Sequence, residues 1–544
     1  MKKRFSLWTV ALLVLLSALI GMEVNTLFSS DRIDMQLRKF GDVLNLTVKY
    51  YVDEVDTQKL TEAAITGLLD QLDPHSVYIP PKAFEQVEED FRGKFEGIGI
   101  QFRVLNDTIT VMEPIGGGPS AKLGILSNDK IVQIDGESAI GFSNDQVREH
   151  LRGPKDSRVT VTIIRTGEPE PLVYEITRDE IPLLSVDAAI MVNDKVGYVR
   201  VNRFNEQTSR EMIEALQKLT GEGMEKLVLD LRVNPGGYLE ESVRMADLFL
   251  SGGTPDKPRT IVYTKGRRPE IEETWEARTG EPYERLPLII LISNISASAS
   301  EIVAGAIQDW DRGLIVGETS FGKGLVQRQF RLPDGSALRL TISKYFTPSG
   351  RLIQRSYEGK DKLEYQREAY QRDEEEGENL EHANDTNGQA DSTRPMFTTN
   401  AGRTVYGGGG ITPDYIVKSD SLTSFTASLR RRDLFTAFVS QYLDGPGFEL
   451  RKTYGGDFKK FRSEYAISDA MLKDFKAFVV SKGVTMDEKA FATDRDYIEA
   501  TLTADVAKAF FGTEAEFHYF LDLDKQFQQA LSLFPEAARI AELQ

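Results

Sequence analysis

The chain has 544 residues, of which 40% are hydrophobic and 28% are charged, and its formal net charge is −18. This length is too great for one hydrophobic core and predicts about three or four domains. The acidic balance argues against the broad basic surface that binding to nucleic acid requires. The absence of cysteine excludes disulfides, thiolate catalysis and cysteine metal sites.

Residues 1–30 have the pattern of an export signal. Lys2, Lys3 and Arg4 precede an uncharged, mostly apolar run from Phe5 to Met22. The run is at the lower limit of what spans a bilayer, about 18 residues, and no clear AxA cleavage site follows it. We therefore favour an uncleaved anchor in the inner membrane over a removed signal peptide. The basic end predicts that the rest of the chain lies outside the cytoplasm, in the periplasm of a cell envelope.

Two regions of different periodicity follow. Residues 31–85 carry apolar residues at helical spacing and predict a small helical module. Residues 86–181 contain short alternating segments such as "GIGIQFRV", "DKIVQIDG" and "RVTVTIIR", separated by turns. This pattern predicts a compact β-rich domain.

Strands and helices alternate from residue 182 to residue 355. The expected strands are "KVGYVRV", "KLVLDLRV", "PLIILIS" and "GLIVGE", and the expected helices are "SREMIEALQKL", "LEESVRMADLFL" and "SASEIVAGAIQDW". The alternation predicts a largely parallel sheet with helices on its faces, and residues 401–418 complete this domain. Such sheets usually bind ligands outside the carboxyl ends of their strands.

The remaining segments are a polar insertion and a helical region. Residues 356–400 include "RDEEEGENLE" and "NDTNGQADST", which predict a surface insertion that is mobile or disordered. Residues 419–544 have aromatic residues at helical spacing, which are typical of a helical core rather than of a cofactor site.

The stretch "NISASASEIVAGAIQDW" places three serines just before a helical run. Ser298 and Glu301 have the spacing of a capping box, in which both side chains only satisfy backbone groups at a helix start. The alternative is that Ser298 is a nucleophile, which requires a neighbouring base.

A lysine is the nearest candidate for that base. The four histidines, His75, His150, His382 and His518, are all distant in sequence, whereas Lys323 follows between two glycines. Serine with lysine is a known variant of the catalytic triad. To act as a base, Lys323 must have its pKa lowered by about 3 units, which burial can achieve. The alternative is a turn lysine that points into solvent.

A second motif, "LVLDLRVNPGG", leads from an apolar strand into a tight turn. The backbone N–H groups of Gly236 and Gly237, together with that of Ala299, are candidates for an oxyanion hole. The alternative is an ordinary turn without a role in catalysis.

These motifs together resemble the carboxyl-terminal processing peptidases, also called tail-specific proteases. The resemblance covers residues 35–418 and includes "LDPHSVYI", "FEGIGI", "DLRVNPGG", "SASASEIVAGAIQD", "GETSFGKGLVQ", "YFTPSGRLIQ" and "GGGGITPD", in that order. It implies a multidomain α/β protein: a ClpP/crotonase-like α/β protease core with an inserted PDZ domain, an N-terminal helical module and a C-terminal helical region.

The resemblance also implies roles for individual residues. Ser298 corresponds to the nucleophile, Lys323 to the base and Gln327 to the residue that orients the lysine. Asp309 matches an acidic position that has been implicated in the family, but a helix from 298 to 309 separates it from Ser298 by about 16 Å. We therefore expect Asp309 to support the fold.

The "GIGI" segment of the PDZ-like domain, formed by Gly97, Ile98, Gly99 and Ile100, is expected to bind the terminal carboxylate of a peptide. The expected function is a serine endopeptidase that recognises free, apolar C-termini of envelope or misfolded proteins. No metal or organic cofactor is implied, nucleic acid is not an expected partner, and a homo-oligomer is compatible with the sequence. The alternatives are a non-catalytic PDZ scaffold and an acyl-CoA-type enzyme on a related fold.

Overall fold

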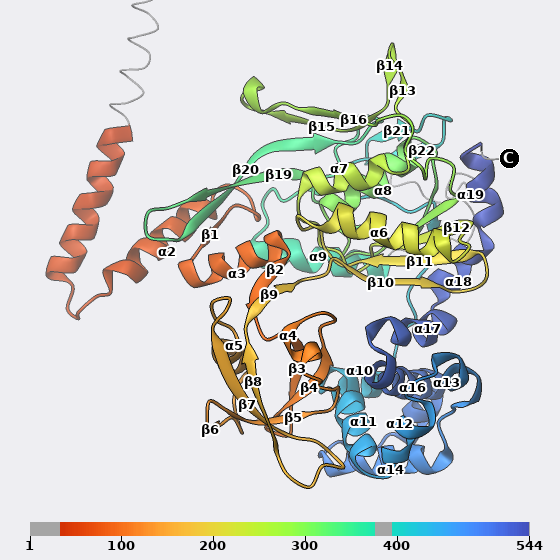
Figure 1. Ribbon diagram of the computed structural model, residues 1–544. Coiled ribbons are helices and arrows are strands. Elements are labelled where there is room, and N and C mark those ends of the chain that lie inside the picture. Colours follow the sequence, from red (N-terminus) through yellow and green to blue (C-terminus); the bar gives the residue numbers. More distant parts are fainter. Residues whose placement is uncertain (1–32, 376–393, 543–544) are drawn as a thin grey trace, which may run out of the picture. The chain divides into compact units, whose positions relative to one another are not determined.

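The computed structural model describes residues 33–375 and 394–542 (Figure 1). The chain divides into two compact units, Met1–Tyr78 and Ile79–Gln544. In the first unit, a helix covers residues 33–50 and is followed by α2 (Thr57–Leu69). The Asp56 carboxylate caps α2 by accepting the N–H groups of Gln58 and Lys59. Strand β1 (Val77–Ile79) lies at the boundary between the units.

The expected apolar run Phe5–Met22 lies outside the described residues. Within residues 33–375 and 394–542, no helix has the length and apolar character needed to cross a membrane. The membrane anchor therefore stays a prediction from the sequence.

The second unit begins with α3 (Pro81–Arg92) and the paired strands β2 (Lys94–Gly97) and β9 (Asp179–Pro182). These strands frame the β-rich domain, whose main strands have the order β3-β4-β5-β7-β8. Its elements are β3 (Ile100–Leu105), β4 (Thr108–Pro114), α4 (Pro119–Lys122), β5 (Lys130–Ile134), β6 (Glu137–Ser138), α5 (Asn144–Leu151), β7 (Arg158–Ile164) and β8 (Leu172–Thr177). Strand β3 is at the edge of this sheet, so one side of its backbone is open.

The predicted α/β domain is present. Its sheet has the strand order β10-β11-β12-β17-β18-β23, in which β10 is antiparallel to β11 and the other neighbours are parallel. The strands are β10 (Val186–Met191), β11 (Val196–Val201), β12 (Lys226–Asp230), β17 (Leu288–Ile292), β18 (Leu314–Gly317) and β23 (Tyr415–Ile416). All residues of β17 are buried, as expected for a strand that is covered on both faces.

Helices α6 (Thr208–Gly221), α7 (Leu239–Asp247) and α8 (Ala299–Asp309) cover one face of this sheet (Figure 1). A second, antiparallel sheet joins β19 (Leu325–Arg331), β20 (Ala337–Phe346), β15 (Thr260–Gly266) and β16 (Thr274–Glu276). Smaller elements are β13 (Gly253–Thr254), β14 (Lys257–Pro258), η1 (Pro269–Ile271), β21 (Met396–Thr398) and β22 (Thr404–Tyr406).

The C-terminal region, residues 419–544, forms two parts: a helical bundle with its own core, and three helices that pack on the α/β sheet. The aromatic pattern of the sequence did not distinguish these two parts. The first part is a bundle of α10 (Ser424–Arg431), α11 (Leu434–Asp444), α12 (Phe448–Tyr454), α13 (Phe458–Glu464), α14 (Asp469–Ser481), α15 (Glu488–Thr493) and α16 (Arg495–Phe511). The second part, α17 (Thr513–Leu523), α18 (Lys525–Ser532) and α19 (Phe534–Ile540), packs Phe517, Phe527 and Phe534 on the other face of the α/β sheet. These last three helices therefore complete the core of the α/β domain.

The prediction that residues 356–400 form a mobile or disordered insertion was wrong for part of this segment. Within residues 356–400, the structure contains helix α9 (Lys362–Glu375), with the side chain of Tyr365 buried. The Tyr365 hydroxyl accepts a hydrogen bond from Gln354 over 2.9 Å, and its carbonyl accepts one from Arg355 over 2.7 Å. Buried Tyr365 and Ala369, with the ion pair of Glu368 and Lys360, thus hold in place a segment whose composition is otherwise typical of a solvated loop.

Candidate active site

Ser298 lies in the connection between buried strand β17 and helix α8, immediately before the first residue of the helix. Its backbone has φ 54° and ψ −110°. Among the described non-glycine residues with positive φ, the others are Asn or Asp except for Glu542. A serine side chain is strained in this conformation, and strain of this kind is concentrated at functional sites.

The other two serines of the motif have structural hydrogen bonds. Ser296 and Ser300 are fully buried. The Ser296 hydroxyl donates to the Leu231 carbonyl over 2.8 Å and accepts the Ser293 N–H over 2.9 Å. The Ser300 hydroxyl donates to the Asn234 carbonyl over 2.9 Å. Ser298 is partly exposed, so it is the serine of the three that a substrate can reach.

The buried carboxylate of Glu301 connects the serine and lysine segments. One oxygen, Oε2, accepts the backbone N–H groups of Ser298 over 2.7 Å and of Lys323 over 2.9 Å. The other oxygen accepts the Ser320 hydroxyl over 2.5 Å and the Gly322 N–H over 2.7 Å. Burial raises the pKa of Glu301, while these four hydrogen bonds act in the opposite direction. The sequence predicted the contact with Ser298 as part of a capping box, but not the contacts with residues 320–323.

Tyr345 makes a second connection between the same segments. Its buried hydroxyl donates to the carbonyl oxygens of Lys323 over 2.6 Å and of Ser298 over 3.0 Å. Burial raises the pKa of Tyr345 well above its usual value, so the hydroxyl keeps its proton. The side-chain nitrogen of Lys323 donates to Gln327 Oε1 over 2.9 Å. Lys323 and Gln327 are therefore in direct contact, and Lys323 is held beside the segment that carries Ser298.

The "NPGG" turn lies against the same site. A side-chain carbon added at Gly236 would be 2.8 Å from Ser298 Cβ and 3.1 Å from the nitrogen of Ala299, so only glycine fits there. At Gly237 it would be 1.9 Å from the Phe204 carbonyl oxygen. The Gly236 N–H is engaged, because it donates to Asn234 Oδ1 over 2.9 Å. No acceptor for the Gly237 N–H is found among the described residues, and Ala299 is the first residue of α8, where the N–H has no acceptor within the helix.

Asp309 has the environment of a structural residue. Its side chain and that of Arg351 are fully buried and form an ion pair over 2.7 Å. The second carboxylate oxygen of Asp309 accepts the Ser349 N–H over 2.9 Å. Asp309 is also the last residue of α8, whereas Ser298 precedes the first. These contacts tie the end of the helix to the segment after β20.

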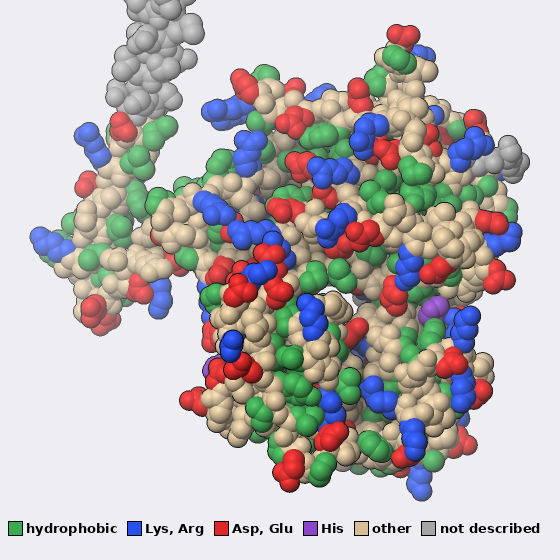
Figure 2. Space-filling view, viewed as in Figure 1, with side chains coloured by type: hydrophobic (Ala, Val, Ile, Leu, Met, Phe, Trp, Pro, Cys, Tyr) green, Lys and Arg blue, Asp and Glu red, His purple; other side chains and the backbone are tan. Residues whose placement is uncertain are grey.

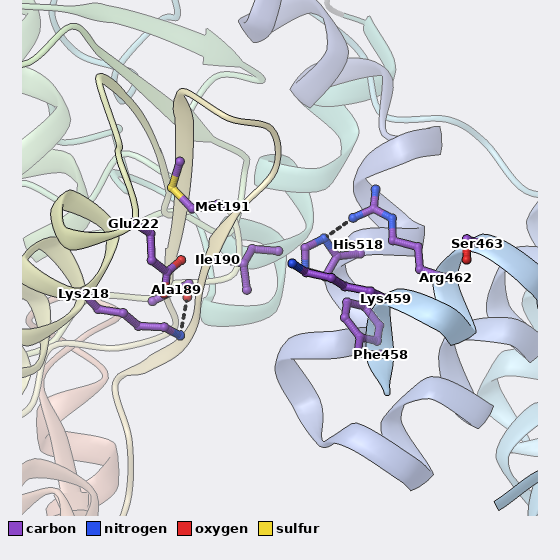
Figure 3. Close-up of a pocket in the computed structure, with 10 residues that line it drawn as sticks. All are labelled: Ala189, Ile190, Met191, Lys218, Glu222, Phe458, Lys459, Arg462, Ser463 and His518. Carbon is purple, nitrogen blue, oxygen red and sulfur yellow. Dashed lines mark hydrogen bonds between the residues drawn. The ribbon is translucent and has the colours of Figure 1, made fainter. Parts of the chain in front are cut away.

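Two of the histidines in the second unit lie on other elements. His150 is an exposed residue of α5 in the β-rich domain. His518 lines a hollow of 460 Å³ between β10 and helices α13 and α17, where Arg462 contacts its ring (Figure 3). Burial lowers the pKa of His518 to about 4. His382 lies outside the described residues. Neither His150 nor His518 lies on an element that forms the Ser298 site.

A groove of 460 Å³ lies along the open edge of β3. It is lined by Ile98, Gly99 and Ile100 of the "GIGI" segment and by residues of α5. Gly99 has φ +76° and turns the chain into β3. No acceptors for the N–H groups of Ile98 and Gly99 are found within the described part of the chain. The groove therefore has an open strand edge and two N–H groups at one end.

The comparisons with known proteins agree with this architecture. Peptidase family S41 matches residues 195–361, and a PDZ domain matches residues 97–174. The N-terminal domain of the activating protease CtpB matches residues 22–83. A family of unknown function (DUF8443) matches residues 425–512.

Curated relatives are similar over most of their length. The carboxy-terminal-processing protease of Bartonella bacilliformis is 40% identical over 323 residues, which are 59% of this chain and 73% of the relative. A CtpA-like serine protease of Staphylococcus aureus strain N315 is 35% identical over 64% of this chain and 68% of its own length. A solved structure, the photosystem II D1 C-terminal processing protease, is 31% identical over 57% of this chain and 82% of that chain, with a TM-score of 0.31.

The chain therefore belongs to the carboxy-terminal-processing proteases of peptidase family S41, which are serine-type peptidases with a PDZ domain. The β-rich domain is this PDZ domain, and the α/β domain is the peptidase core. The sequence did not identify Tyr345 as part of the site, although it lies in the quoted "YFTPSGRLIQ" motif.

Proposed function

We propose that this protein is a serine endopeptidase in which Ser298 is the nucleophile and Lys323 is the general base. The observation that carries the proposal is the double connection of the two residues: Glu301 binds both of their N–H groups, and Tyr345 binds both of their carbonyl groups. Groups that react with each other must be held in one geometry, and buried hydrogen bonds to the backbone do this. The strained backbone and partial exposure of Ser298 support the same assignment.

The reaction would proceed by acyl transfer. The Ser298 hydroxyl oxygen attacks the scissile carbonyl carbon, and its proton passes to the neutral Lys323 amine. Lysine then gives this proton to the leaving amine as the peptide bond breaks. Water, deprotonated by Lys323, hydrolyses the acyl-enzyme and restores the serine. Gln327 would orient the lysine through the hydrogen bond to its side-chain nitrogen.

The oxyanion of the tetrahedral intermediate needs N–H donors beside Ser298. Of the three residues expected from the sequence, Gly237 and Ala299 are the better candidates, because the Gly236 N–H already donates to Asn234. Gly236 would contribute by its lack of a side chain, which allows the turn to approach Ser298.

The PDZ groove would select the substrate. A terminal carboxylate can accept the open N–H groups of Ile98 and Gly99 while the peptide adds as a strand to β3. Charge-assisted hydrogen bonds of this kind are roughly twice as strong as neutral ones. Ile100 and Phe102 lie along the groove and favour an apolar last residue. The expected substrates are proteins with free, apolar C-termini outside the cytoplasm, where the export pattern of residues 1–30 would place the enzyme.

The test is cleavage of an unfolded protein with a free apolar C-terminus. We expect Ser298→Ala, Lys323→Ala and Lys323→Arg to abolish cleavage with normal circular dichroism, because a guanidinium stays protonated and cannot act as a base. Ser296→Ala and Ser300→Ala are matched controls that lose buried hydrogen bonds, about 1–3 kcal/mol each, but keep the nucleophile.

Each outcome separates the proposal from an alternative. Activity in either lysine variant would exclude Lys323 as the base. Loss of activity in folded Ser300→Ala together with an active Ser298→Ala would show that another serine attacks. A wild-type protein that binds such substrates and never cleaves them would be a PDZ scaffold.

A further inference from the structure

One residue that lines the PDZ groove comes from the C-terminal bundle. Asp433, in the connection between α10 and α11, lines the groove together with residues of β3 and α5. Its carboxylate forms an ion pair with Arg103 of β3. Asp433 has φ 53°, a left-handed conformation that Asp and Asn adopt more readily than other side chains. The bundle thus contributes one charged side chain to a groove in another domain.

Several other contacts hold the bundle against the PDZ domain (Figure 1). The Asp444 carboxylate accepts hydrogen bonds from Asn128 over 2.7 Å and from Thr166 over 2.6 Å, and it pairs with Lys130 over 3.1 Å. At the end of β3, Lys482 donates to Asn106 over 2.5 Å. The position of Asp433 beside β3 is therefore fixed by contacts on both sides of it, and the Arg103 ion pair is not needed to bring the two domains together.

The position of Arg103 relates it to one residue of a bound peptide. Side chains alternate along a strand, so Arg103 lies on the face opposite to Ile100 and Phe102. A peptide that adds antiparallel to β3, with its last residue beside Ile100, places its fourth-from-last residue beside Arg103. At that position the peptide side chain meets the guanidinium of Arg103 and the carboxylate of Asp433.

We propose that Asp433 and Arg103 form a charge selector for the fourth-from-last residue of the substrate, in which Asp433 suppresses the preference for acidic side chains that Arg103 alone would create. This inference rests on the proposed binding of free C-termini in the PDZ groove. The substrate class that follows consists of apolar C-termini with a neutral or basic residue at this position. The two side chains of the selector remain 43% and 52% exposed, so both are accessible to a peptide.

The experiment measures binding to the full-length protein by fluorescence anisotropy. Three labelled hexapeptides share a free apolar C-terminus and differ only at the fourth-from-last residue, which is Glu, Gln or Lys, and mass spectrometry confirms that they stay intact. Asp433→Asn should increase affinity for the Glu peptide relative to the Lys peptide by about two- to fivefold, the range of exposed ion pairs. Arg103→Gln should shift the same ratio in the opposite direction. Asp474→Asn is the control, because this exposed carboxylate on α14 does not line the groove.

The measured quantity is the ratio of the affinities for the Glu and Lys peptides. A general loosening of the bundle would weaken the binding of all three peptides equally and would leave this ratio unchanged. An unchanged Glu-to-Lys ratio in both Asp433→Asn and Arg103→Gln would overturn the charge selector. An amidated peptide that binds as tightly as the free acid would instead overturn the proposed recognition of C-termini. High salt should reduce the ratio shift, since exposed charges are screened.

Discussion

Ser298 and Lys323 donate their backbone N–H groups to the same oxygen atom, Oε2 of Glu301. The two residues come from different segments, one before α8 and one before β19, and a fully buried carboxylate joins them. The position of this carboxylate therefore controls the relative position of the proposed nucleophile and base.

Replacing Glu301 by Gln should greatly reduce cleavage. The amide has one acceptor oxygen in place of two, so at least some of the four donors around it lose their partners, at about 1–3 kcal/mol each. We expect kcat to fall by at least tenfold while peptide binding to the PDZ groove is unchanged. Glu211→Gln is the matched control, since this buried carboxylate also accepts several hydrogen bonds, from Ser185 and Val186, away from the site. It should lower stability without changing kcat.

Tyr345→Phe should reduce kcat without unfolding the protein. The change keeps the buried ring but removes the hydroxyl that binds the carbonyl groups of Ser298 and Lys323. The two carbonyl groups share the one hydroxyl hydrogen, and a hydrogen bond contributes about 0.5–1.5 kcal/mol, so a several-fold loss of kcat is expected. Tyr263→Phe on the neighbouring strand β15 is the control. Equal activity of the two variants would show that Tyr345 does not position the site.

Asp309→Asn should destabilise the protein by about 3–5 kcal/mol, because it leaves Arg351 as a buried charge without its carboxylate. The double variant Asp309→Leu/Arg351→Met removes both charges and should recover much of this loss. Urea unfolding followed by tryptophan fluorescence measures both effects. Activity per folded molecule should stay near normal in the double variant. A folded but inactive double variant would give this ion pair a role in catalysis.

Phe527→Ala should lower the free energy of unfolding by about 3–5 kcal/mol, the usual cost of removing a buried phenylalanine side chain. Phe527 is 2% exposed and packs α18 on the α/β sheet. Phe330→Ala, at a position that is 41% exposed on β19, should change stability by no more than about 0.5 kcal/mol. Similar urea midpoints for the two variants would mean that the last helices are not part of the peptidase core.

Asp505→Asn should stabilise the protein at pH 7–8 and have no effect near pH 3. Burial raises the pKa of Asp505 from 3.8 to about 6, against a hydrogen bond from Thr436 over 3.0 Å. The folded state therefore binds the proton more tightly than the unfolded state, and this carboxyl makes the protein less stable as the pH rises from about 4 to about 6. At 1.36 kcal/mol per pKa unit, the gain above pH 6 is at most about 3 kcal/mol. Melting temperatures across this pH range, with Asp474→Asn as the control, measure it.

On the face shown in Figure 2, acidic and basic side chains are interspersed over the described residues. Asp433 and Arg103 form one local ion pair, so their effects should be measured with single substitutions.

Much of the architecture follows from local patterns in the sequence. The apolar run of β17 and the helical spacing of α8 were sufficient to predict a strand followed by a helix, because a strand covered on both faces is apolar throughout and a helix buries one face at its own period. The motifs around Ser298, Lys323 and "NPGG" predicted the peptidase class, and the "GIGI" segment with the short alternating strands after it predicted the PDZ domain. Helix α9 was not predicted, because its buried residues, Tyr365 and Ala369, are few and lie within a polar segment.

The sequence did not predict the contacts between segments that are distant along the chain, and these are seen only in the tertiary structure. Glu301 satisfies a helix-capping pattern within four residues, but its bonds to residues 320–323 depend on how β17, β18 and the following loop pack. The aromatic stripes of the last 120 or so residues predict helices and a core, yet the same stripe pattern serves both a separate bundle and the cover of the α/β sheet. The spacing of apolar residues shows which face of a helix or strand is buried. It does not show which other element packs against that face, because this depends on the tertiary structure.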